Sequence, residues 1–366
     1  MTRWAWCIAL FAWFPPVWAA EPGQRILERL WQDDKNGDGK VTRAEFTGPA
    51  QLFERFDGNK DGVIDKEEAE KFARGATKGG PGAQPPLPEG IEMIRDVVFG
   101  KGGERELKLN VIRPKERLPE PMPVVVWIHG GAWMAGSKEG TPTLALAQKG
   151  YFTVSISYRL SQEAKFPAQI EDCKAAIRWL RAHAKEYGID PERIGVWGSS
   201  AGGHLVALLG TSGGVAELEG KGGWEDQSSR VQAVCDFFGP TDFTRMMEGR
   251  STMDHYAANS PESLLIGGPV LENKDKCAKA NPITYVTADD PPFLIVHGES
   301  DTIVPINSSE LLDVALRKAG VDATFVRAKR GGHGFGPNCE PSAQQIDQMV
   351  IEFFDKHLKQ AKKESK

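Results

Sequence analysis

Short, nearly continuous apolar runs alternate with amphipathic stretches through most of the chain. Runs of this kind, bounded by turn residues, are typical of strands that are covered on both faces. Residues 91–99 and 106–113 instead alternate apolar and polar positions, as antiparallel edge strands do. Residues 168–187 repeat apolar positions at helical spacing and stop at Gly188, which predicts a helix. The predicted strands cover residues 91–99, 106–113, 124–129, 151–158, 193–197, 231–238, 292–297 and 323–327.

Strands that alternate with helices predict an α/β domain built on a mostly parallel sheet. The whole alternating pattern lies within residues 91–358, so we expect one large domain there. The chain has 366 residues, of which 40% are apolar and 26% charged, and these values are ordinary for folded proteins. A formal net charge of −5 offers no basic field, so a nucleic-acid partner is not expected.

The first 20 residues predict a secretory signal peptide. Arg3 is followed by a short apolar stretch over residues 4–14, a Pro-Pro pair and small residues at the position of cleavage. The apolar stretch is too short to span a bilayer, so a membrane anchor is the less favoured interpretation. We therefore expect a secreted or periplasmic protein without a membrane span.

Two segments near the front of the chain repeat a twelve-residue pattern of oxygen-bearing side chains. Oxygen ligands at positions 1, 3, 5 and 9, glycine at position 6 and glutamate at position 12 form the pattern of an EF-hand calcium loop. Position 7 contributes only its backbone carbonyl, so its residue type is free. The candidate calcium ligands are Asp34, Asn36, Asp38, Lys40, Thr42 and Glu45 in the first loop and Asp57, Asn59, Asp61, Val63, Asp65 and Glu68 in the second.

The two loops are expected to form one module. Val41 and Ile64 occupy position 8, where apolar residues favour a short strand pairing between loops. We expect a small all-α EF-hand pair over residues 21–74 and a Gly- and Pro-rich linker over residues 75–90. A dockerin is the rival duplicated calcium module. Dockerin loops usually end in Asp, so they match this chain less well, because its loops end in Glu45 and Glu68. A calcium-dependent protein partner is a further hypothesis.

The two loops differ at position 9. The second loop has Asp65 where the first has Thr42. One more charged oxygen facing the ion predicts tighter calcium binding in the second loop.

The sequence Gly198-Ser199-Ser200-Ala201-Gly202 joins a predicted strand to a predicted helix. Gly-x-Ser-x-Gly is the pattern of a nucleophile elbow, in which the serine occupies a strained strand-to-helix turn. The flanking positions must be nearly free of side chain so that the backbones can pass closely. Ser200, rather than Ser199, is central between the two glycines and is the candidate nucleophile.

Polar residues follow several other predicted strands, where parallel sheets place their chemistry. Asp301 follows the strand over 292–297, and His333 follows the last strand. The chain order Ser, Asp, His is that of α/β-hydrolases. Asp242 also follows a strand and is the alternative acid.

Two glycines follow the strand over 124–129, in His129-Gly130-Gly131-Ala132-Trp133. They leave backbone N–H groups free to point into a cleft, which an oxyanion hole requires. We expect His129 to fix this loop by hydrogen bonding rather than to act as a base. His204 and His297 are expected to be structural histidines.

With these motifs together, residues 91–358 resemble the α/β-hydrolase fold, and among its members the hormone-sensitive-lipase-like and bacterial feruloyl-esterase-like carboxylesterases. The resemblance implies that Ser200 is the nucleophile and His333 the general base. It implies that Asp301 orients the histidine and stabilises its charged form. No cofactor is implied for the chemistry.

The resemblance also implies an oxyanion hole formed by the amides of Gly131, Ala132 and Ala201. Many lipase-like members have a third glycine where this chain has Ala132. A backbone donor needs no particular side chain, so the departure affects only the room for bulky acyl or alcohol groups.

Residues 243–290 show no strong periodicity, and we interpret them as a cap insertion that shapes substrate access. A plain surface excursion is the alternative. Trp133 and Phe335 flank the catalytic loops and are candidates for lining the substrate site, although core filling explains either one equally well. Residues 359–366 are a charged tail.

Four cysteines remain after the predicted signal peptide. Cys173 and Cys235 fall in core-like patterns and are expected to be buried thiols. Cys277 and Cys339 lie in loop-like stretches and are candidates for a disulfide, although the sequence does not fix the pairing.

The sequence therefore predicts a secreted serine carboxylesterase with an appended calcium module. Export and the resemblance favour acetyl or feruloyl esters of polysaccharides, and a general short-chain carboxylesterase or lipase is the enzyme alternative. From another class, the chain could be a calcium-dependent binding protein with an inactive hydrolase scaffold. Calcium is expected to stabilise the front module and to take no part in the chemistry.

Overall fold

The computed structural model describes residues 27, 30–46, 53, 56–78, 87–140 and 142–359. The chain divides into two compact units, residues 1–86 and 87–366. The predicted signal peptide, residues 79–86 of the predicted linker and residues 360–366 of the tail lie outside the described residues. None of the described helices combines the length and apolar character that a membrane crossing requires.

The small unit pairs its two loops as the sequence predicts. Strands β1 (Val41–Thr42) and β2 (Val63–Ile64) are antiparallel, with Val41 opposite Ile64. Helix α3 (Lys66–Lys78) follows the second loop. It ends at Lys78, so its last turn overlaps the first residues of the predicted linker. The buried core consists of Leu30, Val41, Phe53, Phe56, Ile64 and Ala69.

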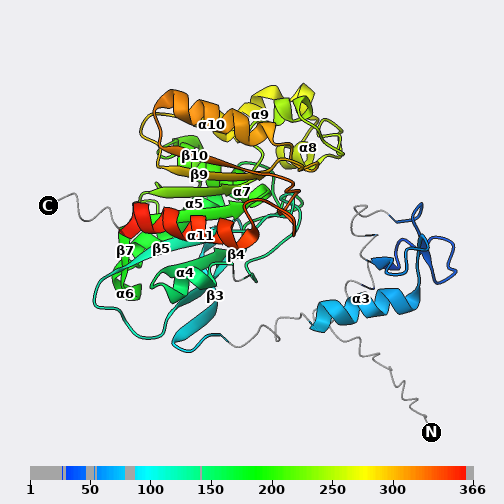
Figure 1. Cartoon of the computed structure of the whole chain (residues 1–366), viewed down its shortest axis with the longest axis horizontal. Helices are drawn as coiled ribbons and strands as arrows, with labels where there is room; N and C mark the ends of the chain where they lie inside the picture. Colours follow the sequence, from blue (N-terminus) through cyan, green and yellow to red (C-terminus); the bar gives the residue numbers. More distant parts are fainter. Residues whose placement is uncertain are drawn as a thin grey trace, which may run out of the picture. The chain divides into compact units, whose positions relative to one another are not determined.

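The large unit is built on one eight-stranded sheet (Figure 1). Its strand order is β10-β9-β8-β7-β5-β6-β4-β3. The pairs β3–β4 and β4–β6 are antiparallel, and the other neighbours are parallel. The strands are β3 (Ile91–Gly102), β4 (Arg105–Pro114), β5 (Met122–Ile128), β6 (Phe152–Ile156), β7 (Ile189–Ser199), β8 (Ala233–Phe237), β9 (Phe293–Gly298) and β10 (Ala323–Ala328).

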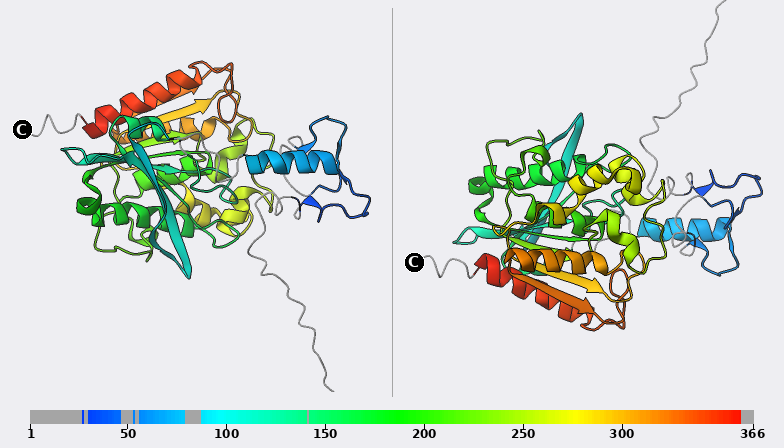
Figure 2. Two further views of the ribbon diagram at one scale, coloured as in Figure 1. Left: turned by 90° about the horizontal axis from the view of Figure 1, so that it is seen from below. Right: turned by 90° about the horizontal axis from the view of Figure 1, so that it is seen from above.

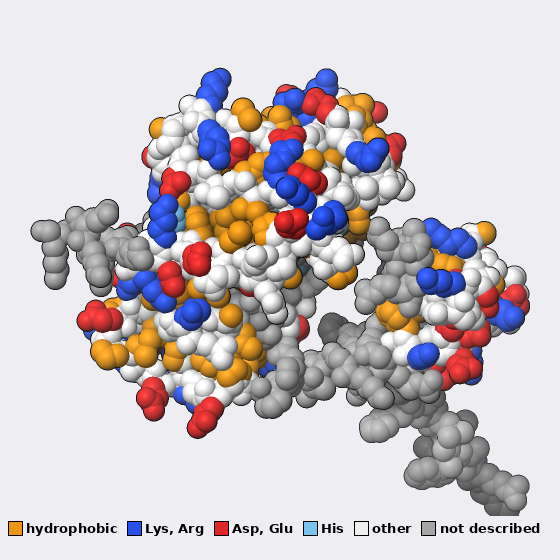
Figure 3. Space-filling view, viewed as in Figure 1, with side chains coloured by type: hydrophobic (Ala, Val, Ile, Leu, Met, Phe, Trp, Pro, Cys, Tyr) orange, Lys and Arg blue, Asp and Glu red, His pale blue; other side chains and the backbone are white. Residues whose placement is uncertain are grey.

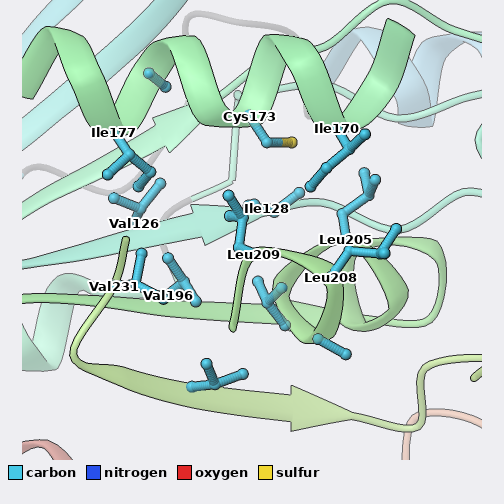
Figure 4. Close-up of a cluster of buried hydrophobic side chains, with 14 of the residues drawn as sticks. Val126, Ile128, Ile170, Cys173, Ile177, Val196, Leu205, Leu208, Leu209 and Val231 are labelled. Carbon is cyan, nitrogen blue, oxygen red and sulfur yellow. The ribbon is translucent and has the colours of Figure 1, made fainter. Parts of the chain in front are cut away.

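Helices cover both faces of this sheet, so its central strands are buried on both sides. Val124 and Val126 point into the core formed with α5, α7 and α10, whereas Val125 points into the core formed with α11. Figure 4 shows side chains of α5 and α7 meeting those of the strands, and Figure 2 shows α11 along one side of the large unit. The helices are α4 (Leu144–Gln148), α5 (Ala168–Ala182), α6 (Ala184–Tyr187), α7 (Ala201–Thr211), α10 (Asn307–Ala319) and α11 (Ala343–Phe354).

The helix predicted over residues 168–187 is divided. It breaks at His183 into α5 and α6, and Gly188, with a φ of 66°, ends α6 in the left-handed conformation.

On the face shown in Figure 3, acidic and basic side chains are interspersed over the large unit.

The segment 243–290 folds into short helices rather than an irregular excursion. Phe243, Met246, Leu265 and Val270 are buried in the same core as α7. The segment is therefore part of the main packing of the unit. Its elements are η3 (Phe243–Glu248), α8 (Pro261–Ile266), η4 (Val270–Glu272), α9 (Lys274–Ala280) and η5 (Pro282–Tyr285).

The four cysteines of the described residues are buried free thiols. Cys277 Sγ lies 3.6 Å from the carbonyl oxygen of Val270, and Cys339 Sγ lies 2.8 Å from that of Pro341. The candidate disulfide between Cys277 and Cys339 is therefore wrong, because each thiol is buried against a carbonyl near its own place in the chain.

The junction of β7 and α7 is tightly packed against β5. Ser200 has a φ of 55° and a ψ of −122°, a conformation that few residues adopt. A Cβ atom on Gly202 would overlap the carbonyl oxygen of Ile128, and one on Gly198 would overlap the carbonyl oxygen of Gly202. Both glycines are therefore required by close backbone contacts.

Replacing Gly202 with alanine is expected to destabilise the large unit by about 3 kcal/mol, because the methyl group has only backbone atoms to displace. Urea unfolding of the purified protein measures the change. Gly140→Ala is the control, since its Cβ would meet only Pro142 at an ordinary 3.4 Å. Equal stability of the two variants would contradict the packing described.

Candidate active site

The structure brings Ser200, His333 and Asp301 together from three separate strand ends. His333 Nε2 lies 3.1 Å from Ser200 Oγ, and His333 Nδ1 lies 2.7 Å from Asp301 Oδ2. Ser200 follows β7, Asp301 follows β9 and His333 follows β10. The imidazole thus connects the hydroxyl with the carboxylate, as base-assisted nucleophilic catalysis requires.

Asp301 is buried and surrounded by donors. Its Oδ1 accepts the amides of Ile303 at 2.8 Å and Val304 at 3.0 Å, and its Oδ2 also lies 3.4 Å from His297 Nε2. Burial alone would raise the pKa of Asp301, but hydrogen bonds from His297 and His333 outweigh it and hold the pKa well below its ordinary range. Asp301 therefore faces His333 as a carboxylate.

The alternative acid, Asp242, has a different task. Its Oδ1 accepts the Thr244 amide at 3.0 Å at the start of η3 and the side-chain amide of Asn281, also at 3.0 Å. Ser199, the neighbour of Ser200, is still part of β7 and pairs with Phe237 of β8. Geometry therefore favours Asp301 and Ser200 over these two alternatives.

The loop after β5 has the backbone conformation that an amide-lined pocket needs. Gly131, Ala132 and Trp133 all have positive φ values, of 108°, 55° and 56°. Within the described part of the chain, the amides of Gly131 and Ala132 donate to no protein acceptor. Ala201 is the first residue of α7, so its amide has no acceptor within the helix. These three amides remain our candidates for binding an oxyanion.

The two aromatic residues proposed to line the substrate site are buried instead. Trp133 is 2% exposed, and its Nε1 donates to His204 Nδ1 at 3.2 Å. Phe335 is 9% exposed and packs on Phe237 and Phe238 at centroid distances of 5.2 and 5.3 Å. Both side chains fill the core beneath the catalytic loops, so the lining prediction is corrected.

The remaining histidines near the site are held by backbone groups. His129 Nδ1 lies 2.7 Å from the Gly130 carbonyl, and its ring stacks on Tyr158 at 4.3 Å. His204 Nε2 lies 2.7 Å from the Ala280 carbonyl, and burial lowers the pKa of His204 to about 4. His204 is therefore a neutral, structural residue at neutral pH, as the sequence predicts.

Phe238 is a site residue that the sequence analysis missed. Its ring lies 4.6 Å from the His333 ring, and the carbonyl of Phe237 accepts the Ser200 amide at 2.8 Å. The end of β8 thus supports both the base and the nucleophile. The sequence signal that could have identified Phe238 is the Phe237-Phe238 pair at the end of a predicted strand.

The two loops of the small unit have the donor set that calcium prefers. Asp57, Asp61 and Glu68 each present a carboxylate oxygen within 4.8 Å of the others. Glu68 Oε1 reaches across the loop to the Asn59 amide at 3.0 Å, whereas Glu45 Oε2 accepts the nearby amide of Thr42 at 3.0 Å. Positive φ values of 78° at Gly39 and 86° at Gly62 give both loops their turn. These residues fit a hard cation, and the second loop is the better organised.

Comparison with known proteins agrees with this geometry. The sequence profile of the BD-FAE family matches residues 109–316, and that of the EF hand matches residues 34–47 and 50–73. The chain belongs to the BD-FAE family. Its large unit therefore has the α/β-hydrolase fold, as the sequence motifs predict.

Several esterases are similar to this BD-FAE family member. Probable carboxylic ester hydrolase LipM of Mycobacterium tuberculosis is 36% identical over 218 residues, which are 58% of this chain and 49% of that protein. A bifunctional GH43-CE protein of Bacteroides eggerthii is 40% identical with a TM-score of 0.64, covering 72% of this chain and 38% of that one. A truncated carbohydrate esterase from gut microbiota is 33% identical with a TM-score of 0.67, covering 75% of this chain and 99% of that one. The chain spans about half the length of LipM.

Beneath the elbow of this BD-FAE protein lies a fully buried carboxyl group, Asp236. Its Oδ1 accepts the Gly239 amide at 2.9 Å, and its Oδ2 has no partner among the described residues. Burial raises the pKa of Asp236 from its ordinary 3.8 to about 7.

Exchanging Asp301 for asparagine is expected to lower kcat by roughly 10⁴-fold, because the amide cannot hold the required histidine tautomer. Asp242→Asn keeps the oxygen that accepts from Thr244 and should retain most activity. Steady-state hydrolysis of a chromogenic ester measures both. Loss of activity in Asp242→Asn alone would show that the acid has been misassigned.

The contribution of Asp236 to stability should fall as pH rises from about 4 to about 7, because the unfolded chain releases the Asp236 proton over this range while the folded protein holds it. The shift corresponds to up to roughly 4 kcal/mol. Asp236→Asn keeps the acceptor for Gly239, so its stability advantage over the wild type should grow across this window. Urea unfolding at several pH values tests this, and a difference that does not change with pH would contradict it.

Calcium should bind more tightly to the second loop than to the first, because Asp65 adds a charge and Glu68 already closes the loop. In calorimetric titrations of the full chain, Glu68→Gln should remove the tighter event and Glu45→Gln the weaker one. Equal sites, or a tighter first site, would refute this order.

Proposed function

We propose that the protein is a serine carboxylesterase that works through an acyl-enzyme intermediate. The observation that supports this most strongly is the continuous contact from Ser200 Oγ through the His333 ring to the Asp301 carboxylate. The names of the similar proteins, a carboxylic ester hydrolase and a carbohydrate esterase, point in the same direction.

In the first half of the reaction, His333 Nε2 takes the hydroxyl proton as Ser200 Oγ bonds to the ester carbonyl carbon. The carbonyl oxygen becomes an oxyanion facing the amides of Gly131, Ala132 and Ala201. The bond to the alcohol oxygen then breaks, and His333 delivers its proton to that oxygen. Asp301 stabilises the imidazolium between these two transfers.

In the second half, a water molecule replaces the alcohol. His333 takes a proton from the water as its oxygen bonds to the acyl carbon, and the bond to Ser200 Oγ breaks. The proton returns to the serine oxygen, and the carboxylic acid leaves. The proton that leaves with the alcohol comes from Ser200, and the proton that restores Ser200 comes from water, so the two halves balance without a cofactor.

The proposed substrates are acetyl or feruloyl esters of polysaccharides. Two structural neighbours support a carbohydrate ester, since one is named a carbohydrate esterase and the other a bifunctional GH43-CE protein. A general short-chain carboxylesterase or lipase activity is the second candidate, supported by the similarity to LipM. We further propose export of the protein to the periplasm or beyond, on the basis of residues 1–20.

In the small unit, the proposed ligand is calcium, held by the carboxylates and amide oxygens of the two loops. Bound calcium would neutralise the gathered carboxylates of Asp57, Asp61 and Glu68 and so stabilise that unit. The unit folds around its own core of buried residues. We therefore expect calcium to stabilise the small unit and to take no part in ester turnover.

Labelling with a fluorophosphonate probe tests the proposed function. The wild type should be labelled stoichiometrically and should hydrolyse aryl acetates, whereas Ser200→Ala should lose both properties. A panel of acetylated xylan, methyl ferulate and aryl esters of increasing chain length then distinguishes the two candidate substrate classes. Absence of both labelling and turnover in the wild type would instead support a calcium-dependent binding protein.

A further inference from the structure

A second group of serine, histidine and carboxylate lies outside the proposed catalytic triad, in the segment 243–290. His255 Nε2 lies 3.0 Å from Ser251 Oγ, and His255 Nδ1 lies 3.0 Å from Glu262 Oε1. His255 is 1% exposed and Glu262 is 3% exposed. Such a buried polar group has to be explained, because polar side chains are costly to bury unless they are satisfied.

Ser251 is held too firmly to act as a nucleophile. Its Oγ accepts the Met253 amide at 3.0 Å, contacts His255 and donates to the carbonyl oxygen of Thr302 at 3.1 Å. A hydroxyl has one proton and two lone pairs, so these three partners use its full capacity. Ser251 therefore links segment 243–290 to the loop that carries Asp301.

The carbonyl oxygen of Thr302 accepts hydrogen bonds from two consecutive residues of segment 243–290, Ser251 and Thr252. Besides Ser251 Oγ, it accepts the Thr252 amide at 2.8 Å and the Thr252 hydroxyl at 3.0 Å. This carbonyl and the N–H of Ile303 belong to one planar peptide group. The Ile303 N–H in turn donates to Asp301 Oδ1 at 2.8 Å.

Fixing the oxygen end of this peptide group therefore fixes the direction in which its N–H end points. Hydrogen bonds accepted by the carbonyl also polarise the group and strengthen the bond that its N–H donates. Glu262 restrains the ring of His255, and Ser260 Oγ donates to the His255 carbonyl at 2.9 Å. A continuous chain of contacts thus runs from the start of α8 to the carboxylate of Asp301.

We propose that Ser251 and His255 are positioning residues for ester hydrolysis, which hold the Asp301 carboxylate toward His333 through the Thr302–Ile303 peptide group; this inference rests on the proposed function. The segment 243–290 thereby completes the catalytic site in addition to shaping the molecule around it.

Ser251→Ala in the full-length protein is the direct test. It should lower kcat by roughly 10- to 100-fold with KM changed less than about twofold, because a positioning defect affects the transition state more than substrate binding. Ser251→Thr restores the hydroxyl and should recover most of kcat. Tyr256→Phe is the matched control, since it removes another bond from the same segment to a backbone carbonyl, that of Thr244, without touching Thr302.

The low-field proton resonance of His333 Nδ1–H gives a readout that does not require turnover. It should shift in Ser251→Ala and in His255→Gln and remain in place in Tyr256→Phe. An unchanged resonance together with wild-type kcat in Ser251→Ala would overturn the proposal. A wild type that hydrolyses no ester would contradict the proposed function instead, and the resonance would still decide whether Ser251 positions Asp301.

Discussion

The positive φ of Ser200 is the backbone constraint on which the catalytic end of the large unit depends. A non-glycine residue in such a conformation is strained by about 1–3 kcal/mol and persists only where its surroundings enforce it. Here the Ser200 amide donates to Phe237 of β8, and the Ser200 carbonyl accepts the amide of His204 one turn along α7. This turn places Ser200 Oγ at the end of the strand, 3.1 Å from His333 Nε2.

Several buried polar groups lie around this turn. Asp301 is fixed by two backbone amides and two histidines. Asp236 lies under the elbow, where the Gly239 amide is the one partner of its carboxyl group among the described residues. His204 ties Trp133, on the loop after β5, to the Ala280 carbonyl at the end of α9. Each of these groups is costly to bury, so loosening any one of these contacts would leave a buried polar group unsatisfied.

The sequence predicted the parts of the molecule that depend on local patterns. Gly198 and Gly202 marked the elbow, and Val41 and Ile64 marked the pairing of the calcium loops. Alternating positions located β3 and β4, and apolar runs located the other strands of the large sheet. These signals are strong because a close backbone approach or a doubly covered strand restricts the residue types at fixed spacing.

The remaining features depend on contacts between distant residues, which one sequence does not show. The burial of Trp133 requires Phe243 and His204 as neighbours, and the core role of segment 243–290 requires its packing on α7. The break at His183 likewise follows no local breaker residue, since proline and glycine are absent there. Ser251 and Thr302 are 51 residues apart in the sequence, and no local pattern indicates their contact.

Ser200 is expected to carry the acyl group during turnover, and trapping the acyl-enzyme tests this assignment. The protein is mixed with an aryl acetate, the reaction is quenched in acid during steady turnover, and the peptides are analysed by mass spectrometry. An acetyl group should be found on the peptide that contains Ser200, located on that residue and lost once the substrate is exhausted. Steady turnover with no acetylated peptide, or with the acetyl group on another residue such as Ser199, would contradict it.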